Sequence, residues 1–194
     1  MFETVREYAR ERLELRGELA ELRRRHAEFY ARLGQAAEPH LRGPGREWLD
    51  RVEAELDNFR SALDCSLEAD VELGVRIAES LLSFWHLRAH EAEARRWVER
   101  ALATSDGLSP TARATGLHVL GALLFWEGDF ERSARALEES LALSRAAGDQ
   151  RRIAEIANTL GNSMWALGDR KRTRKLREEA IRLGWELRDP RGDA

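Results

Sequence analysis

Apolar residues recur along this chain at the three- and four-residue spacing of a helix face, and they do not alternate as they do in strands. The pattern therefore predicts an all-α protein. We expect helices over about residues 2–16, 18–37, 46–67, 70–88, 90–104, 110–127, 130–147, 150–167 and 170–188.

Local signals place several of the helix ends. Gly17 is expected to stop the first helix, because glycine readily takes the left-handed conformation that ends a helix. Ser109 followed by Pro110 predicts a start, since serine caps free amides and proline is tolerated at the first helical position. The segment PHLRGPG (39–45) is predicted to break the chain after the second helix.

The last third of the chain contains an internal repeat. Residues 121–149 align without gaps on residues 161–189, at an offset of 40. The identical pairs include Gly121/Gly161, Gly128/Gly168, Asp129/Asp169, Arg132/Arg172, Glu138/Glu178, Glu139/Glu179, Leu143/Leu183 and Asp149/Asp189. Residues 87–102 then align on 126–141 at an offset of 39, as a degenerate copy with Ala89 in place of glycine. Such a period is typical of stacked helix pairs, in which a small residue lets two helices approach and Gly-Asp separates them.

The repeat resembles the tetratricopeptide repeat, which carries Leu-Gly in its first helix and a Gly-Asp turn before its second. Leu120-Gly121 and Leu160-Gly161 match the first element, whereas the consensus tryptophan is replaced by Leu117 and Ala157. The 40-residue spacing resembles the variant found in large bacterial signalling ATPases and in MalT-like and LuxR-type transcriptional regulators. The resemblance implies a right-handed superhelix of stacked antiparallel helix pairs, with repeats near 70–108, 110–149 and 150–189.

The N-terminal part has a resemblance of its own. FETVREYARERLELRGE, then LRRRHAEFYARL and EWLDRVEAELDNFRSAL, are similar to the stretch of those ATPases that links a winged-helix end to the repeat array. This resemblance implies linker helices over 1–45 and a repeat domain over 46–194. It also implies that the chain is a fragment, or a shortened relative, of a larger regulator.

Composition is compatible with a packed interior and gives no sign of a dominant charged partner. The 194 residues are 43% hydrophobic with a formal net charge of −3, so no global field favours nucleic acid or an anionic membrane. Cys65 is the single cysteine, which excludes an intramolecular disulfide and fits a reducing compartment. The start lacks the apolar stretch of a signal peptide, and we expect a cytoplasmic protein without a membrane span.

The sequence offers no catalytic or cofactor-binding motif. Neither Lys171 nor Lys175 follows a glycine-rich turn, so a phosphate loop is missing and we expect no ATP hydrolysis by this chain. His86 and His90 have the four-residue spacing of a helical metal site but straddle the turn expected at Ala89. We therefore expect no enzyme, no metal and no cofactor.

One segment hints at nucleic acid or an acidic partner. RKRTRKLR (170–177) carries six basic residues: Arg170, Lys171, Arg172, Arg174, Lys175 and Arg177. It contains no aromatic residue for base stacking, and the simpler interpretation is a solvated face of the last helix.

The repeat register selects a candidate partner-binding groove, because in the tetratricopeptide family the first helix of each unit lines a concave surface. The positions that correspond are Arg76, Glu79, Ser83 and His86, then Thr115, His118, Phe125 and Trp126, and finally Glu155, Asn158, Asn162 and Trp165. Aromatic anchors combined with amide donors are typical of protein recognition. Phe125 and Trp165 could equally be core residues.

The main expectation is a protein-interaction scaffold or sensor region of a bacterial signalling ATPase or transcriptional regulator. It would bind a protein or peptide partner, or a neighbouring domain of its parent protein. The alternative is a nucleic-acid-binding accessory that uses residues 170–177. The chain could also form a homodimer through its exposed repeat end, where Leu183, Trp185 and Leu187 have little to cover them.

Overall fold

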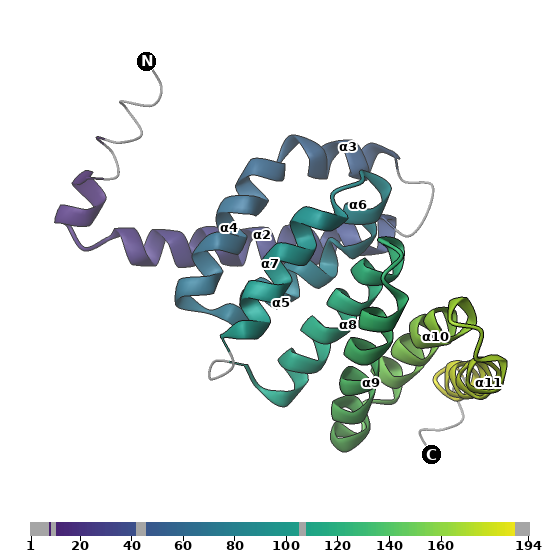
Figure 1. Cartoon of the computed structure of the whole chain (residues 1–194). Helices are drawn as coiled ribbons and strands as arrows, with labels where there is room; N and C mark the ends of the chain where they lie inside the picture. The colour runs from purple at the N-terminus through teal and green to yellow at the C-terminus, as the bar shows by residue number, and fades with distance from the viewer. Residues whose placement is uncertain (1–7, 9–10, 42–45, 105–107, 189–194) are drawn as a thin grey trace.

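A computed structural model describes residues 8, 11–41, 46–104 and 108–188, and within these ranges every regular element is an α-helix (Figure 1). The predicted all-α class is confirmed. Among the described residues, no helix is long and apolar enough to cross a bilayer.

The N-terminal half is built around α2 (Leu19–Leu41), which follows a turn at Gly17 with φ +68°. The helix continues past the predicted end at residue 37, so the first three residues of the segment expected to break the chain, 39–41, are helical, and residues 42–45 lie outside the described residues. Pro39 lies in the last turn, where its missing N–H costs at most one helical bond. Ala37 and Leu41 are buried there, at 0% and 2% exposure, and hold that turn against the core.

Two predicted helices are each divided in the structure. Residues 46–67 form α3 (Arg46–Ala54) and α4 (Leu56–Ala69), and residues 70–88 form α5 (Val71–Ser80) and α6 (Leu82–Leu87). The breaks lie at Glu55 and Leu81, whose ψ angles of 7° and 4° depart from helical values. Leu81 is fully buried, so the apolar spacing continues across the break and does not reveal it.

The remaining helices begin and end close to the predicted positions: α7 (Glu91–Ala103), α8 (Pro110–Trp126), α9 (Phe130–Ala147), α10 (Gln150–Ala166) and α11 (Arg170–Glu186). Ser109 caps α8 as expected, because its side chain accepts a hydrogen bond from the Ala112 amide. Asp129 and Asp169 cap α9 and α11 in the same way. The signals were readable because each turn carries a residue whose chemistry defines it.

The turns at equivalent positions of the internal repeat have the same left-handed geometry, and the turn of the degenerate copy shares it. Gly128 and Gly168, at equivalent positions, have φ angles of +85° and +82°. Ala89 aligns with them and has φ +57°, the one positive value at a non-glycine residue in the described part of the chain. The third copy therefore keeps the turn geometry although it lost the glycine.

The buried side chains form two apolar clusters along the chain. The first joins α2 to α8 and centres on Phe59, Phe84 and Trp85, which are at most 1% exposed. The second joins α9, α10 and α11 through Leu137, Ile156 and Leu160. In Figure 1 the helices from α8 to α11 follow one another towards the C-terminal end, each beside the next.

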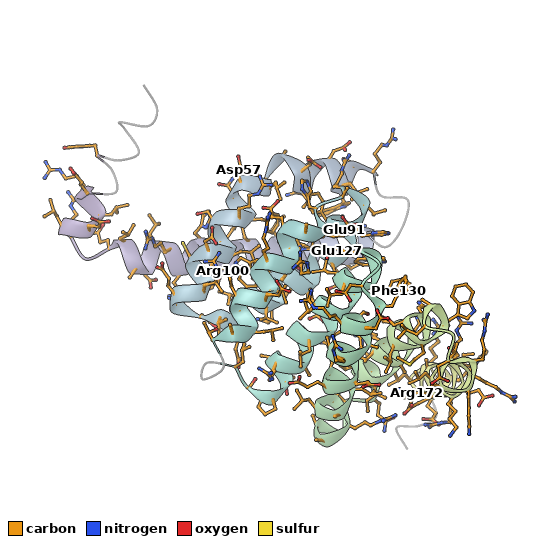
Figure 2. The ribbon with its side chains drawn as sticks, viewed as in Figure 1. Asp57, Glu91, Arg100, Glu127, Phe130 and Arg172 are labelled. Atoms are coloured by element: carbon orange, nitrogen blue, oxygen red, sulfur yellow. The ribbon has the colours of Figure 1, made fainter. Side chains whose placement is uncertain are left out.

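Ion pairs tie alternate helices together on one surface. Arg60 Nε of α4 lies 2.5 Å from Glu93 Oε1 of α7, and Glu99 Oε1 of α7 lies 2.7 Å from Arg132 Nη2 of α9. The step from α9 to α11 is made by Arg145 with Glu179 and by Glu138 with Arg172. Arg172 is labelled on α11 in Figure 2. Each exposed pair contributes little stability, about 0–1 kcal/mol. Their repetition shows that the second helices of successive pairs lie in the same register.

Candidate functional site

A cleft of about 340 Å³ lies along α8, between α5 and α6 on one side and α10 on the other. The residues that line it come from five helices: Glu38 of α2, Glu79 and Ser80 of α5, Leu82 and Ser83 of α6, His118, Ala122, Phe125 and Trp126 of α8, and Glu155, Asn158, Thr159 and Asn162 of α10.

Eight of the twelve groove residues predicted from the repeat register line this one cleft: Glu79, Ser83, His118, Phe125, Trp126, Glu155, Asn158 and Asn162. They are separated by up to 83 positions in the sequence, so their convergence comes from the stacking of helix pairs.

The other four predicted residues lie outside the lining. Arg76 is exposed on α5. Thr115 is buried and its hydroxyl donates to the Thr111 carbonyl, because this end of α8 is covered by neighbouring helices. Trp165 is 52% exposed, beyond the cleft, with the Arg170 guanidinium 5.2 Å from its ring centre. His86 lies just behind the cleft and stacks on Trp126, with ring centres 4.2 Å apart.

Glu38 is the main lining residue of the cleft that the sequence analysis did not predict. The second helix was predicted to end at residue 37, whereas α2 continues to Leu41 and carries Glu38 to the cleft. No local signal in the sequence indicates that α2 should lie beside α10.

One end of the cleft is strongly acidic. Among the described residues, Glu38, Glu79 and Glu155 are the only ones with a carboxylate or a basic side chain other than histidine in its lining. Arg152 of α10 reaches across to form an ion pair with Glu79 of α5, 73 residues away in the sequence, and its Nη1 lies 3.9 Å from Glu155 Oε2.

The Arg152 pair is largely protected from solvent, with 17% of the arginine side chain and 25% of the glutamate side chain exposed. Burial works against the charge of Arg152, but the hydrogen bond and attraction of Glu79 outweigh it, so the pKa of Arg152 is raised. Arg152 therefore remains protonated and connects the two walls.

The opposite end of the cleft is aromatic and amide-rich. Phe125 and Trp126 are half-buried at the end of α8, and Trp126 is held flat against the His86 ring, with an interplanar angle of 11°. Asn158 is exposed on α10, and the Asn162 side-chain oxygen accepts a long hydrogen bond, 3.4 Å, from Arg177 of α11. This end offers apolar surface beside hydrogen-bonding groups.

The basic segment 170–177 lies on α11, outside the cleft. Its six charged residues are exposed, but Arg172 pairs with Glu138 and Arg174 pairs with Glu178 at 2.7 Å. Neighbouring carboxylates thus neutralise part of its positive charge.

His86 and His90 do not face a common centre. The Nδ1 atom of His86 lies 2.9 Å from Glu91, whereas the His90 ring stacks on Phe84 at 5.9 Å. Within the described ranges, no three histidine, cysteine or acidic side chains are grouped so that they could hold a metal ion.

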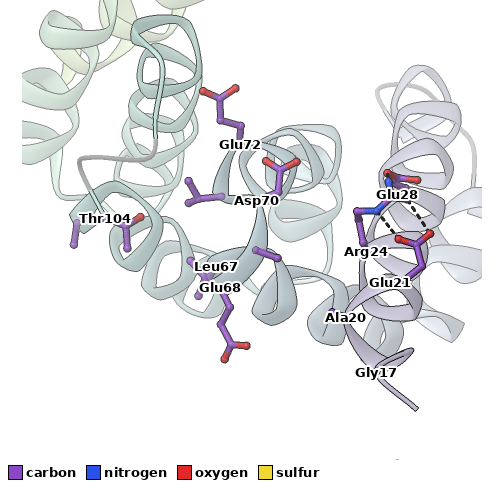
Figure 3. Close-up of a pocket in the computed structure, with 13 residues that line it drawn as sticks. Gly17, Ala20, Glu21, Arg24, Glu28, Leu67, Glu68, Asp70, Glu72 and Thr104 are labelled. Carbon is purple, nitrogen blue, oxygen red and sulfur yellow. Dashed lines mark hydrogen bonds and ion pairs between the residues drawn. The ribbon is translucent and has the colours of Figure 1, made fainter. Parts of the chain in front are cut away.

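A larger hollow of about 1190 Å³ lies at the other end of the molecule, between the start of α2 and the ends of α4 and α7. Figure 3 shows that its side chains stand far apart around a wide opening. Arg24 is the one basic residue in its lining and is already bound to Glu21 and Glu28. The hollow therefore offers no convergent set of groups.

The last helix leaves part of its surface uncovered. Trp185 and Leu187 are 73% and 53% exposed, as expected, but Leu183 is buried against α10, and its predicted exposure was wrong. Ile181, which sequence reasoning did not select, is 60% exposed.

The sequence is similar to part of known bacterial regulators. It is 28% identical over 172 residues to proteins of Mycobacterium tuberculosis and Mycobacterium bovis whose names read "putative HTH-type transcriptional regulator". The match covers 84% of this chain and 19% of each relative, so the chain spans about a fifth of the length of the curated relatives it matches. No family model matches the chain.

Proposed function

We propose that this chain is a protein-interaction region of a bacterial transcriptional regulator and that the cleft along α8 binds a partner segment or a neighbouring domain. The observation that carries the proposal is the convergence on one cleft of eight residues that were selected from the repeat register and the tetratricopeptide resemblance. Similarity to helix-turn-helix regulators supports the regulatory setting.

We further propose that residues 46–194 form a right-handed superhelix of tetratricopeptide type, preceded by linker helices over 1–45. Its support is the shared geometry of three turns, at Ala89, Gly128 and Gly168, and the ion pairs that repeat from α7 to α11. In such an array each pair contacts only its neighbours, and the first helices present a continuous surface. The role is binding rather than catalysis, since the cleft presents recognition groups from separate helices.

The mechanism would be a population shift. A segment that binds α5, α8 and α10 at once favours the arrangement in which the walls have their present spacing. A regulator whose active and inactive states differ in that spacing would respond to such a partner.

The test uses peptides selected from a random displayed library on the purified chain, followed by affinity measurement with each variant. Replacement of Trp126 and Asn162 together by alanine should weaken binding by at least about tenfold, because aromatic anchors in clefts commonly contribute most of the binding energy. Unchanged affinity, or failure to select any peptide, would overturn the groove assignment.

Trp165→Ala is the matched control, because Trp165 is an exposed tryptophan outside the cleft. It should leave the affinity unchanged. Far-UV circular dichroism of each variant shows whether the helices are intact.

The alternative, nucleic-acid binding through residues 170–177, has a narrower basis. Lys171 and Lys175 are exposed, but Arg172 and Arg174 already pair with carboxylates. Salt-sensitive retention of duplex DNA that is lost on Lys171→Glu with Lys175→Glu would favour this alternative.

A further inference from the structure

We infer that the cleft accepts a positively charged side chain, so that its partner is a peptide segment with arginine or lysine close to an apolar residue. This inference rests on the proposed function and adds the chemistry of the partner. It follows from the distribution of charge along the cleft.

The lining brings three carboxylates together from three different helices. Glu38 comes from α2, Glu79 from α5 and Glu155 from α10, and no described lysine or arginine lines the cleft. The adjoining hollow adds Asp149, with Arg151 and Arg152 as its cations. Among the described residues, four carboxylates and two guanidinium groups thus line the two hollows together.

The chain itself demonstrates which chemistry this end of the cleft binds. Arg152 reaches Glu79 from another helix, and Arg151 Nε lies 3.5 Å from Glu155 Oε1. Guanidinium groups therefore already bind these carboxylates. Arg151 is 75% exposed in its side chain, so its contact is open to competition from an incoming cation.

The remaining part of the cleft determines what must accompany the cation. Phe125 and Trp126 present half-buried aromatic surface, and a polar or charged group placed there would lose water without compensation. Asn158 and Asn162 lie on the α10 wall and can pair with the backbone of an extended segment. A short segment with one basic and one apolar side chain satisfies both ends.

Other cations and other partners fit less well. Among the described residues, the carboxylates are not grouped closely enough to hold a metal ion. An acidic peptide or nucleic acid would meet the carboxylates of Glu38, Glu79 and Glu155. At the opposite edge of the cleft, Arg177 donates a hydrogen bond to the lining residue Asn162.

The experiment selects peptides from a random displayed library on the whole purified chain and compares their composition with the starting library. We expect enrichment of arginine or lysine within a few residues of an apolar residue. Synthetic versions with capped ends should lose about tenfold in affinity when the basic residue becomes glutamine, and they should bind more weakly as salt rises.

Glu155→Gln tests the site directly, because it removes one charge and keeps the shape. It should reduce the affinity for the basic peptides severalfold and leave the affinity for their glutamine versions unchanged. Glu131→Gln is the matched control, since Glu131 is exposed on α9 and lies outside both hollows.

Failure of this inference is distinguishable from failure of the proposed function. Suppose that the selected peptides are neutral or acidic, that they lose affinity for the Trp126→Ala with Asn162→Ala variant, and that Glu155→Gln leaves their affinity unchanged. The inferred partner chemistry is then wrong, and the groove assignment stands. If no peptide is selected, or if Trp126→Ala with Asn162→Ala leaves binding unchanged, the groove itself is wrong.

Discussion

Identical residues in two repeats have different structural roles because their neighbours differ. A Cβ added at Gly121 would lie 2.4 Å from Leu137 Cγ, whereas one added at Gly161 would meet Arg177 Cγ at 3.5 Å, an ordinary contact. Leu137 is fully buried and has no room to move. The structure therefore requires a residue without a Cβ at Gly121, whereas Gly161 has room for one.

This difference gives a paired prediction. Gly121→Ala should destabilise the protein by about 1–2 kcal/mol, because overpacking against Leu137 exceeds the gain in helix propensity. Gly161→Ala should stabilise it by up to about 1 kcal/mol, since only the propensity gain applies. Urea unfolding measures both, and equal effects would contradict the packing argument.

A second prediction at this scale concerns Tyr30. Its hydroxyl donates a 2.7 Å hydrogen bond to Glu55, and burial together with this carboxylate raises the pKa of Tyr30 to about 12. In a Tyr8→Phe background, where Tyr30 is the only tyrosine, ultraviolet titration should therefore show ionisation near pH 12. Glu55→Gln should lower that pKa.

The sign of the stability effect follows from the same shift. An unfolded tyrosine has a pKa of about 10. Because the folded value is higher, the stabilisation is complete below about pH 10 and is lost as pH rises towards the folded pKa. Because Glu55→Gln lowers the folded pKa, the loss of unfolding free energy between about pH 10 and pH 12 should be smaller in this variant than in the wild-type chain. An unchanged pH dependence would show that Glu55 does not raise the pKa of Tyr30.

At the scale of helices, the sequence predicts limits well where a turn has its own chemistry. The last four helices begin at Pro110, Phe130, Gln150 and Arg170, directly after capping side chains. In the first half the chain bends at Glu55 and Leu81 without glycine, proline or a cap. Those bends depend on packing between helices that are distant in sequence, which periodicity does not report.

The same distinction explains the site. The register selects residues of α8 and α10 that line one cleft, because the two repeats share one spacing, but Glu38 enters from a helix outside the repeat. Thr115 and Trp165 were assigned to the groove by analogy of position. Packing of α8 against its neighbours buries Thr115, and Trp165 is exposed on α10 beyond the wall of the cleft. Alignment predicts which face of a helix is used, and tertiary packing decides how much of it is accessible.

The turn between α6 and α7 gives a prediction of its own. Ala89 has φ +57°, a left-handed conformation that costs a residue with a Cβ about 1–2 kcal/mol. Ala89→Gly should stabilise the protein by about 0.5–1 kcal/mol after the greater entropy of unfolded glycine is subtracted. Gly128→Ala should show the opposite sign, because Gly128 occupies the equivalent turn with φ +85°. Thermal unfolding of the two variants tests the pair, and a destabilised Ala89→Gly would argue against the shared turn.

At the scale of the whole molecule, stacking leaves the two ends unequal. The first apolar cluster gathers helices from α2 to α8 around large aromatic residues, whereas the second depends on three helices with aliphatic side chains. The cleft lies where the two parts meet, with Glu38 and Glu79 supplied by the first and Glu155 by the second. Loss of the Arg152–Glu79 pair should therefore alter the spacing of the cleft walls more than the packing of either apolar cluster.

The outer face of α11 is the place where self-association is expected. Ile181 aligns with Leu141 at the 40-residue offset, and Leu141 is 5% exposed because it packs with α10 and α11, whereas Ile181 is 60% exposed. Trp185 stands one turn further along the same face and is 73% exposed. Exposed apolar residues on a face that is buried in the preceding repeat favour contact with another surface.

Sedimentation velocity over a range of concentrations should show a dimer that Ile181→Glu with Trp185→Glu abolishes. Leu22→Ser, at an exposed apolar residue of α2, should leave the dimer intact, whereas a wild-type chain that stays monomeric at every concentration would show that α11 makes no such contact.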